Sequence, residues 1–148
     1  MIATGAGVVV LSCSDPRLNP YQILGIDGKT VKATMVRNAG GRVFDAIRTL
    51  AVLQTIGQPG TIVVMHHTDC GMTHFHDDAI KEALLQIAPE EKASIEASKF
   101  GEIKGSIRED LALIRASPLI KKTTQVVGLK YDIHTGVLSQ VEETKCEL

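Results

Sequence analysis

The sequence predicts an α/β fold with a mostly parallel central sheet that is flanked by helices. Two short apolar runs, Val8-Val9-Val10-Leu11 and Ile62-Val63-Val64-Met65, are rich in β-branched residues and show no alternation of apolar and polar positions. Such runs are typical of strands that are buried on both faces of a parallel sheet. Stretches with helical spacing of apolar residues lie between the runs, and strands that alternate with helices indicate a parallel sheet.

We expect about four parallel strands and one short edge strand. The predicted strands cover residues 7–12, 32–37, 61–66, 125–131 and 137–141. The predicted helices cover residues 20–25, 42–56, 77–87, 89–99 and 103–116.

Turns and stops separate these elements. The helix over 42–56 is expected to end at Gly57, which is a suitable C-terminal stop. The run Asn38-Ala39-Gly40-Gly41 follows the second strand, and its residues tolerate positive φ in a turn. Residues 132–136 are expected to form a hairpin-like turn into the last strand.

Length and composition favour a single domain over residues 1–148, large enough to bury a core. The formal net charge of −1, from 16 basic and 17 acidic residues, gives no electrostatic reason to expect binding to nucleic acid or to a membrane surface. No apolar run has the length of a bilayer-spanning helix. The first residues lack the positive region of a secretion signal, and three cysteines are too few for a disulfide scaffold. We therefore expect a cytoplasmic protein with free thiols.

Two polar clusters follow the two apolar runs directly. Cys13-Ser14-Asp15-Pro16-Arg17 follows the first run, and His66-His67-Thr68-Asp69-Cys70 follows the second. Ligands gather beyond the carboxyl ends of strands in open α/β sheets. If the chain turns helically after the second run, His67 and Cys70 lie on one face. Three thiolate and imidazole ligands with an open fourth position are typical of catalytic zinc, so Cys13, His67 and Cys70 are candidate Zn²⁺ ligands.

The alternative for Cys13 and Cys70 is that both are core thiols, since free cysteine is among the most buried residue types. Asp15 and Arg17 also have a simple alternative, because such a pair on a loop is usually an ordinary ion pair. Beside a metal, Asp15 would accept a hydrogen bond from metal-bound water, and Arg17 would hold the carboxylate in place and ionised. The sequence leaves open whether Asp15 or water is the fourth ligand at rest.

The other polar residues near the second cluster and at the chain end have simpler interpretations. His66 is expected to pack at the strand end rather than bind metal. His74 and His76 are expected to be solvated, and Asp69 is expected to cap the helix that follows. Cys146 is expected to be a free surface thiol.

The two clusters resemble the motifs of the β-class carbonic anhydrases, which are Cys-x-Asp-x-Arg and, later in the chain, His-x-x-Cys. The likeness covers nearly the whole chain and is greatest to the short, archaeal-like branch of the family. It extends to residues 37–41, 116–120 and 128–136. The resemblance implies that Cys13, His67 and Cys70 bind zinc and that Asp15 and Arg17 form the catalytic dyad.

The resemblance implies hydration of CO₂ to bicarbonate by a zinc-bound hydroxide. The substrate pocket is expected to include Gly71, Asn38, Ala39 and Gly40. Relatives of this fold hydrolyse carbonyl sulfide (COS) or carbon disulfide, and the metal motif does not separate these substrates from CO₂. A zinc hydrolase that releases H₂S is therefore the alternative. A non-catalytic zinc module is a third interpretation, which the dyad disfavours because a structural site would be closed by a fourth protein ligand.

The resemblance also implies a homodimer or homotetramer with the pocket near a subunit boundary. Family members usually carry a helical arm before the first cysteine that wraps a partner subunit. Only twelve residues precede Cys13, so the arm is expected to be missing or trimmed. Some members have an inhibitory bicarbonate site formed by an arginine, a Trp and a Tyr. Arg37 matches the arginine, but the chain has no Trp, and this regulation is not expected.

Overall fold

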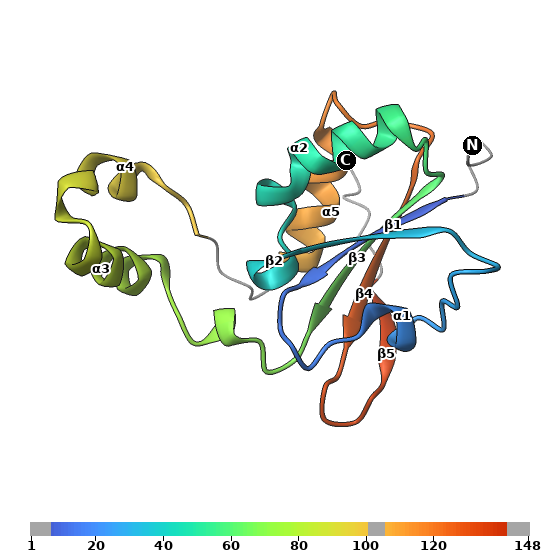
Figure 1. The fold of residues 1–148 in the computed structure, drawn as a ribbon, viewed down its shortest axis with the longest axis horizontal. Helices are drawn as coiled ribbons and strands as arrows, with labels where there is room; N and C mark the ends of the chain where they lie inside the picture. The colour runs from blue at the N-terminus through green and yellow to red at the C-terminus, as the bar shows by residue number, and fades with distance from the viewer. Residues whose placement is uncertain (1–6, 101–105, 142–148) are drawn as a thin grey trace, which may run out of the picture.

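Within the described residues, 7–100 and 106–141, the computed structural model contains one sheet of five strands (Figure 1). The strands are β1 (Val8–Cys13), β2 (Ala33–Asn38), β3 (Thr61–His67), β4 (Gln125–Tyr131) and β5 (Leu138–Val141). Their order across the sheet is β2-β1-β3-β4-β5, in which β1 to β4 are parallel and β5 is antiparallel to β4. The predicted α/β fold, with four parallel strands and a short edge strand, is confirmed.

The main core lies between the sheet and two helices, α2 (Val43–Ile56) and α5 (Ser106–Ala116). Both helices contact the strands and each other, so they cover the same face of the sheet. Strand side chains alternate between faces, and Leu11 of β1 and Val64 of β3 pack with residues of these helices. Both side chains are fully buried, and burying a side chain of this size contributes about 1.5–3 kcal/mol.

The register of the sheet brings the functional strand ends together. Ser12 of β1 lies beside Met65 of β3, and Cys13 lies beside Asn38 of β2. Because β1, β2 and β3 are parallel, the segments that follow all three strands leave from the same edge. The segment after β1 and the segment after β3 are therefore neighbours in space.

Helix α1 is shorter than predicted for a local reason. Helix α1 covers Pro20–Ile23, and Gly25 follows it with a φ of +63°, a conformation that ends helices. Helix α5 ends where predicted, and residues 103–105 of its predicted range lie outside the described residues. In the described part of the chain, none of the helices combines the length and the apolar character that crossing a bilayer requires.

Helices α3 (Asp77–Ile87) and α4 (Lys92–Ala97) form a hairpin that extends away from the sheet (Figure 1). Helix α3 has its predicted bounds. The helix predicted over 89–99 begins instead as a 3₁₀ turn, η3 (Pro89–Glu91), and ends at Ser98, whose backbone is extended with a ψ of 147°. The helices of the hairpin contact each other and η3, and α3 has no fully buried residue.

Candidate metal centre

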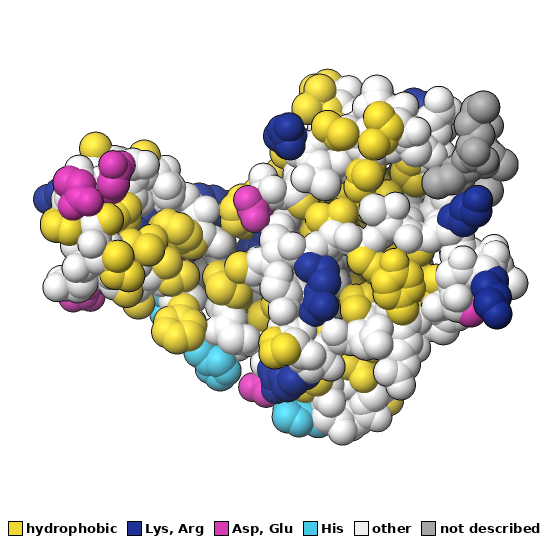
Figure 2. Space-filling view, in the orientation of Figure 1, with side chains coloured by type: hydrophobic (Ala, Val, Ile, Leu, Met, Phe, Trp, Pro, Cys, Tyr) yellow, Lys and Arg dark blue, Asp and Glu magenta, His cyan; other side chains and the backbone are white. Residues whose placement is uncertain are grey.

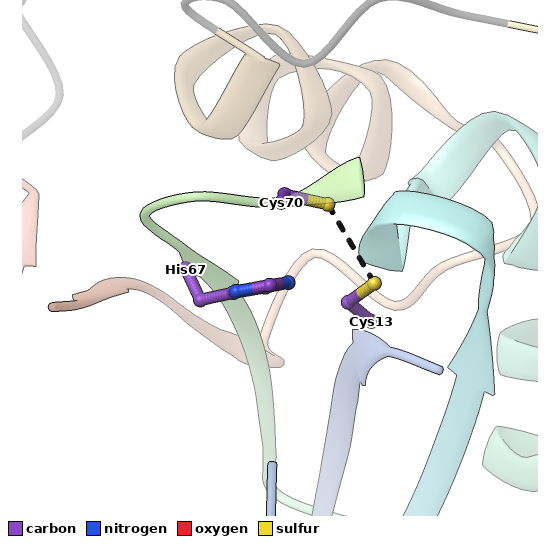
Figure 3. Close-up of side chains that lie close together, drawn as sticks. All are labelled: Cys13, His67 and Cys70. Carbon is purple, nitrogen blue, oxygen red and sulfur yellow. Dashed lines mark hydrogen bonds between the residues drawn. The ribbon is translucent and has the colours of Figure 1, made fainter. Parts of the chain in front are cut away.

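Three buried side chains, those of Cys13, His67 and Cys70, meet at the carboxyl edge of the sheet (Figure 3). One potential ligand atom from each residue lies within 4.8 Å of the other two. The two Sγ atoms are 3.7 Å apart, and the His67 ring points toward them (Figure 3). The fold thus brings together the residues that the sequence singled out as candidate zinc ligands.

A tight turn after β3 brings Cys70 back toward the strand end. Asp69 in this turn has a φ of 51°, in the left-handed region that Asp adopts more readily than most residues. The Thr68 N–H donates to the carbonyl of Tyr131 over 2.9 Å, which fixes the start of the turn. A 3₁₀ turn, η2 (Gly71–Thr73), begins only after Cys70. The interpretation that the chain turns helically between His67 and Cys70 is therefore wrong, although the two residues do lie close together.

The geometry and the hydrogen bonding of the cluster fit a bound metal ion. Among the described residues, neither ring nitrogen of His67 has a hydrogen-bond partner, although both are buried. Buried polar atoms are rarely left unpaired, and a metal would satisfy one of these nitrogens. Two thiolates on a tetrahedral zinc, each with a Zn–S distance of about 2.3 Å, lie about 3.8 Å apart. The observed separation of 3.7 Å between Cys13 and Cys70 is close to that value.

The electrostatics of the two thiols favours a cation between them. A hydrogen bond from Cys70 lowers the pKa of Cys13 to about 4, against the opposing effect of burial. The same contact raises the pKa of Cys70, and burial raises it further. The pair therefore loses one proton easily, whereas a second negative charge 3.7 Å from the first is unfavourable in a buried site. A divalent cation would remove this repulsion, so the donor set suits Zn²⁺.

Asp15 and Arg17 form the pair that the sequence predicted. The Nε and Nη2 atoms of Arg17 donate to the two carboxylate oxygens of Asp15 over 3.0 and 2.7 Å, and the Arg17 backbone N–H donates to Oδ1 over 2.9 Å. The Arg17 guanidinium holds the pKa of Asp15 well below its usual range. The Oδ2 atom of Asp15 is 3.8 Å from Nε2 of His67. The ionised carboxylate therefore lies directly beside the cluster.

Asp69 does not cap the following helix, and that prediction is wrong. The Nη1 atom of Arg17 donates to Asp69 Oδ2 over 2.8 Å, and Nη2 donates to the Asp69 carbonyl over 2.8 Å. The position before η2 is occupied by Cys70, because Asp69 belongs to the tight turn. Arg17 thus bridges two acidic side chains, and these contacts raise its pKa. The exposed His74 and His134 lie 3.6 and 3.9 Å from the Asp69 carboxylate.

The predicted substrate-pocket residues lie at the end of β2 and in two neighbouring turns. Asn38 is the last residue of β2, Ala39 and Gly40 lie in the first turn, and Gly71 lies in the second. The first turn is the 3₁₀ turn η1 (Ala39–Gly41), which contacts η2. The backbone of Gly40 is one of the neighbouring groups that lower the pKa of the Cys13 thiol. The Asn38 side-chain amide bonds both the N–H and the carbonyl of Arg42, over 2.8 Å each, and closes the turn. Both polar atoms of the Asn38 side chain are therefore hydrogen-bonded to the backbone of Arg42.

Further contacts shape the surroundings of the thiols. Arg37 holds the segment after β1, because its Nε donates to the Cys13 carbonyl over 3.0 Å and its Nη2 donates to the Asp15 carbonyl over 2.7 Å. Leu18 is buried together with Cys13 and Cys70. Leu18 forms an apolar wall beside the two thiols together with four partly buried side chains, which are Ile23, Met72, Tyr131 and Ile133.

A second charged cluster, which the sequence did not indicate, is buried next to the metal centre. Arg42 donates from Nε to both carboxylate oxygens of Asp110, over 3.2 and 3.0 Å. The Nε2 atom of His66 lies 3.2 Å from Asp110 Oδ2. His66 is thus buried outside the metal cluster, as predicted, but it is a polar partner rather than only a packing residue. An Arg after a glycine turn and an Asp within a helical stretch carry no local signal that they will meet.

His74 and His76 are exposed, as expected. Cys146 lies outside the described residues.

Comparisons with known proteins agree with this site. A family model described as "Carbonic anhydrase" matches residues 8–138. Beta-carbonic anhydrase 1 of Mycobacterium tuberculosis is 35% identical over 135 residues, which cover 90% of this chain and 81% of that protein. A carbon disulfide hydrolase of Acidithiobacillus thiooxidans is 31% identical over 147 residues, which cover 87% of this chain and 74% of that protein.

The solved structure of a carbonic anhydrase from Glaciozyma antarctica is also similar to this fold. It has a TM-score of 0.84 and 33% sequence identity, and the match covers 94% of this chain and 83% of that one. The agreement of the family model, the relatives and the structural match shows that this chain belongs to the β-class carbonic anhydrase family.

Proposed function

We propose that this protein is a zinc-dependent enzyme that hydrates CO₂ to bicarbonate and a proton. The observation that carries the proposal is the buried cluster of Cys13, His67 and Cys70 with the Asp15 carboxylate beside it. These three residues would hold Zn²⁺, which supplies the Lewis acidity that makes water a nucleophile near neutral pH. Membership of the carbonic anhydrase family supports the same assignment.

Asp15 has the position of a group that orients the attacking water. Its carboxylate is kept ionised by Arg17, so it can only accept hydrogen bonds. Both of its oxygens bond Arg17, which keeps the carboxylate from turning onto a ligand position. A water O–H that donates to Asp15 would have its oxygen lone pair directed at the substrate carbon. The Asp15–Arg17 pair therefore supplies orientation rather than proton transfer.

The apolar wall suits a small, uncharged, linear substrate. Leu18, Met72 and Ile133 would exclude bulk water from the reacting atoms. The turn that begins at Gly71 contacts the turn with Ala39 and Gly40, and these residues would offer backbone groups to the substrate oxygen. We propose that Asn38 contributes by closing this turn, since its amide is bonded to Arg42.

A second candidate function is hydrolysis of COS or carbon disulfide with release of H₂S. The relative from Acidithiobacillus thiooxidans, which is 31% identical, is a carbon disulfide hydrolase. The same cluster and dyad would serve either reaction, so the walls of the pocket must decide the preference. One atom of difference in an apolar pocket changes the rate by roughly 10- to 200-fold, and a few wall residues would be enough to reverse it.

A non-catalytic zinc module is the weakest candidate. A structural site is closed by four protein ligands, whereas the cluster found among the described residues has three. The Oδ2 atom of Asp15 lies 3.8 Å from Nε2 of His67, and this carboxylate is held in an ion pair with Arg17. The free, buried thiols also fit the reducing cytoplasm, where we propose that the protein acts.

The metal assignment is tested by elemental analysis of Cys70→Ser. This variant is expected to lose nearly all of its zinc, because a catalytic-type site with two remaining protein ligands binds the ion weakly. Cys146→Ser is the matched control, since it removes the cysteine outside the proposed ligand set. A full zinc equivalent in Cys70→Ser would show that the ligand set is wrong.

The substrate assignment is tested on one zinc-loaded preparation of the wild-type protein. CO₂ hydration is followed by stopped-flow pH-indicator measurements, and COS or carbon disulfide hydrolysis is followed by H₂S release. We expect a higher kcat/KM for CO₂. Slow CO₂ hydration beside fast H₂S release would assign the protein to the second candidate function.

We also propose that the protein works as a homodimer or homotetramer. The hairpin of α3 and α4 extends from the body, and apolar side chains gather on it (Figure 2). Phe75, just before the hairpin, is 55% exposed, and Ile87 at the end of α3 is 78% exposed. Multi-angle light scattering is expected to give at least twice the mass of the chain. A fully active monomer at micromolar concentration would contradict this proposal.

A further inference from the structure

The buried cluster of Arg42, Asp110 and His66 contacts both segments that carry the proposed metal ligands. Arg42 is 1% exposed, Asp110 is fully buried and His66 is 4% exposed. We propose that this cluster is a positioning network, which fixes the η1 turn against Cys13 and fixes the end of β3 that carries His67. The inference rests on the proposed function, because it assigns the network a role in holding the zinc site.

Asp110 is the centre of the network. It comes from α5, and its two carboxylate oxygens share a bifurcated hydrogen bond from the Nε–H of Arg42. Arg42 follows the η1 turn directly, donates from Nη2 to Glu109 over 2.7 Å, and lies over the Phe44 ring at 5.2 Å. One side of the metal centre is thus tied to the helix that covers the sheet.

His66 ties the other side of the metal centre to the same carboxylate. Its Nε2 atom is 3.2 Å from Asp110 Oδ2 and 3.2 Å from the carbonyl oxygen of Gly41. Both neighbours are acceptors, so Nε2 carries the hydrogen and donates toward them. His66 directly precedes His67 on β3, so a ring fixed by these two contacts also fixes the backbone from which the His67 ring projects.

The η1 turn is in backbone contact with the segment that carries Cys13. A Cβ atom on Gly41 would lie 2.8 Å from the carbonyl carbon of Ser12 and 2.9 Å from the nitrogen of Cys13. Gly41 also has a φ of +69°, so both its conformation and its surroundings require glycine. Any shift of the turn is therefore transmitted to Cys13 through direct contact.

A purely stabilising role does not explain this arrangement well. Burying an arginine and an aspartate has a desolvation cost that their attraction often only offsets, and apolar residues of similar volume are often as stable. The network differs from an ordinary buried pair because its contacts converge on Gly41 and on His66, each next to a ligand-bearing segment. That placement is typical of residues that orient the ligands of a metal.

The test is zinc affinity, measured by competition with a chromophoric chelator at fixed pH. Asp110→Asn keeps the shape of the side chain and removes its charge. Loss of a residue that orients metal ligands typically weakens metal binding by about 10- to 100-fold, and we expect the zinc Kd to rise within this range. We also expect a shift in the visible absorption bands of the Co²⁺-substituted variant, which report the ligand geometry.

Thr124→Val is the matched control. Thr124 and Gln54 form another buried polar pair, at the opposite edge of the sheet, where the Gln54 amide donates to the Thr124 hydroxyl. This variant is expected to lower the melting temperature but to leave the zinc Kd and the Co²⁺ spectrum unchanged. An Asp110→Asn protein with the zinc Kd and spectrum of the wild type would overturn the positioning role.

A second pair of variants decides the question if Asp110→Asn does not fold. His66→Gln keeps an N–H donor toward Gly41 and Asp110, whereas His66→Leu removes it. Weak zinc binding in His66→Leu that is recovered in His66→Gln supports the proposal, and equal, wild-type affinity in both overturns it. Failure of the wild-type protein to bind zinc would instead refute the proposed function, and the network's role with it, so the two failures are distinguishable.

Discussion

Two arginines on either side of the metal centre make the same kind of contacts in opposite environments. Arg17 bridges Asp15 and Asp69, and its side chain is 47% exposed. Arg42 bridges Asp110 and Glu109, and its side chain is 1% exposed. Each arginine donates to both oxygens of one carboxylate. The difference between them is burial, and burial decides what each cluster can contribute.

An exposed ion pair contributes little to stability because water and salt screen it; about 0–1 kcal/mol is usual. The cluster around Arg17 is therefore poorly suited to hold the fold together, but it keeps a carboxylate ionised and aimed beside the metal ligands. The Arg42 and Asp110 side chains are out of reach of solvent, although Glu109 is 49% exposed, so breaking the Arg42–Asp110 pair leaves an unpaired charge in the core. Orientation near the reacting atoms and support behind the ligands are thus divided between two chemically similar clusters.

The largest expected effect is on stability when the buried arginine is removed. Arg42→Met leaves Asp110 without its main partner, and breaking a buried pair in this way costs about 3–5 kcal/mol. The matched change at the exposed site, Arg17→Met, is expected to lower the free energy of unfolding by less than about 1 kcal/mol. Urea denaturation of both metal-free variants measures the difference without a contribution from zinc binding. Equal losses in the two variants would mean that burial does not separate the two clusters.

The second effect is on activity, for which the exposed cluster around Arg17 is expected to matter more than the buried cluster around Arg42. Asp15→Asn keeps the shape of the side chain but removes the charge beside the metal ligands, and we expect kcat/KM to fall by about 100-fold, the lower end for loss of a positioned catalytic group. Asp69→Asn changes the outer partner of Arg17 and is expected to lower kcat/KM much less. Stopped-flow assays at equal zinc content measure both variants. An unchanged rate in Asp15→Asn would remove the dyad from the mechanism.

A smaller effect is expected from salt. The Debye length falls from about 10 Å at 0.1 M to about 3 Å at 1 M ionic strength, and screening acts mainly on exposed charges. The stability difference between wild type and Arg17→Met is therefore expected to shrink as NaCl is raised, whereas the difference for Arg42→Met is expected to change much less, because its partner Asp110 is fully buried. The measurement is the urea midpoint of each protein across a series of NaCl concentrations. A loss at Arg42 that depends on salt as strongly as the loss at Arg17 would indicate that water reaches Asp110.

The fold could be predicted because its signals are local. Each parallel strand is a short run of apolar residues, and the strand ends fix which edge carries the polar clusters. The end of α4 was less predictable, since the helical spacing continues past Ala97 while the backbone at Ser98 is already extended. The three candidate ligands and the Asp15–Arg17 dyad could also be identified from residue type and spacing, because these signals too are local.

The rest of the site depends on contacts between distant segments. Asp69 stands before a predicted helix, and only the turn at positive φ places its carboxylate on Arg17 instead. Arg42 and Asp110 come together only after α5 has packed on the sheet beside α2. The requirement for glycine at Gly41 follows from its contact with the Cys13 segment, whereas the sequence indicated only a turn. Partners of this kind cannot be identified from the pattern on either segment alone.

The smallest expected effect concerns a carboxylate that has no arginine, which provides a reference for both clusters. Asp132 lies in the turn before β5, where backbone N–H groups of Thr135 and His134 donate to it and hold its pKa below the usual range. In the unfolded chain its pKa is near the ordinary value of about 3.9. The unfolded state therefore binds more protons in the acidic range, and stability falls as the pH falls.

The sign of this effect gives a specific test. The stabilisation by the Asp132 charge is fully present above about pH 4 to 5, and it is lost as the pH falls through the folded-state pKa. Asp132→Asn keeps a hydrogen-bond acceptor without the charge, so we expect a small loss of stability at pH 7 that disappears toward pH 2. Urea midpoints of the metal-free proteins between pH 7 and 2 measure it. Because Asp132 is only partly buried and its hydrogen-bond donors are neutral backbone groups, its loss at pH 7 should be smaller than that of Arg42→Met. If Asp132→Asn lost as much stability at pH 7 as Arg42→Met, backbone N–H groups in a turn would stabilise a carboxylate as strongly as a buried arginine does.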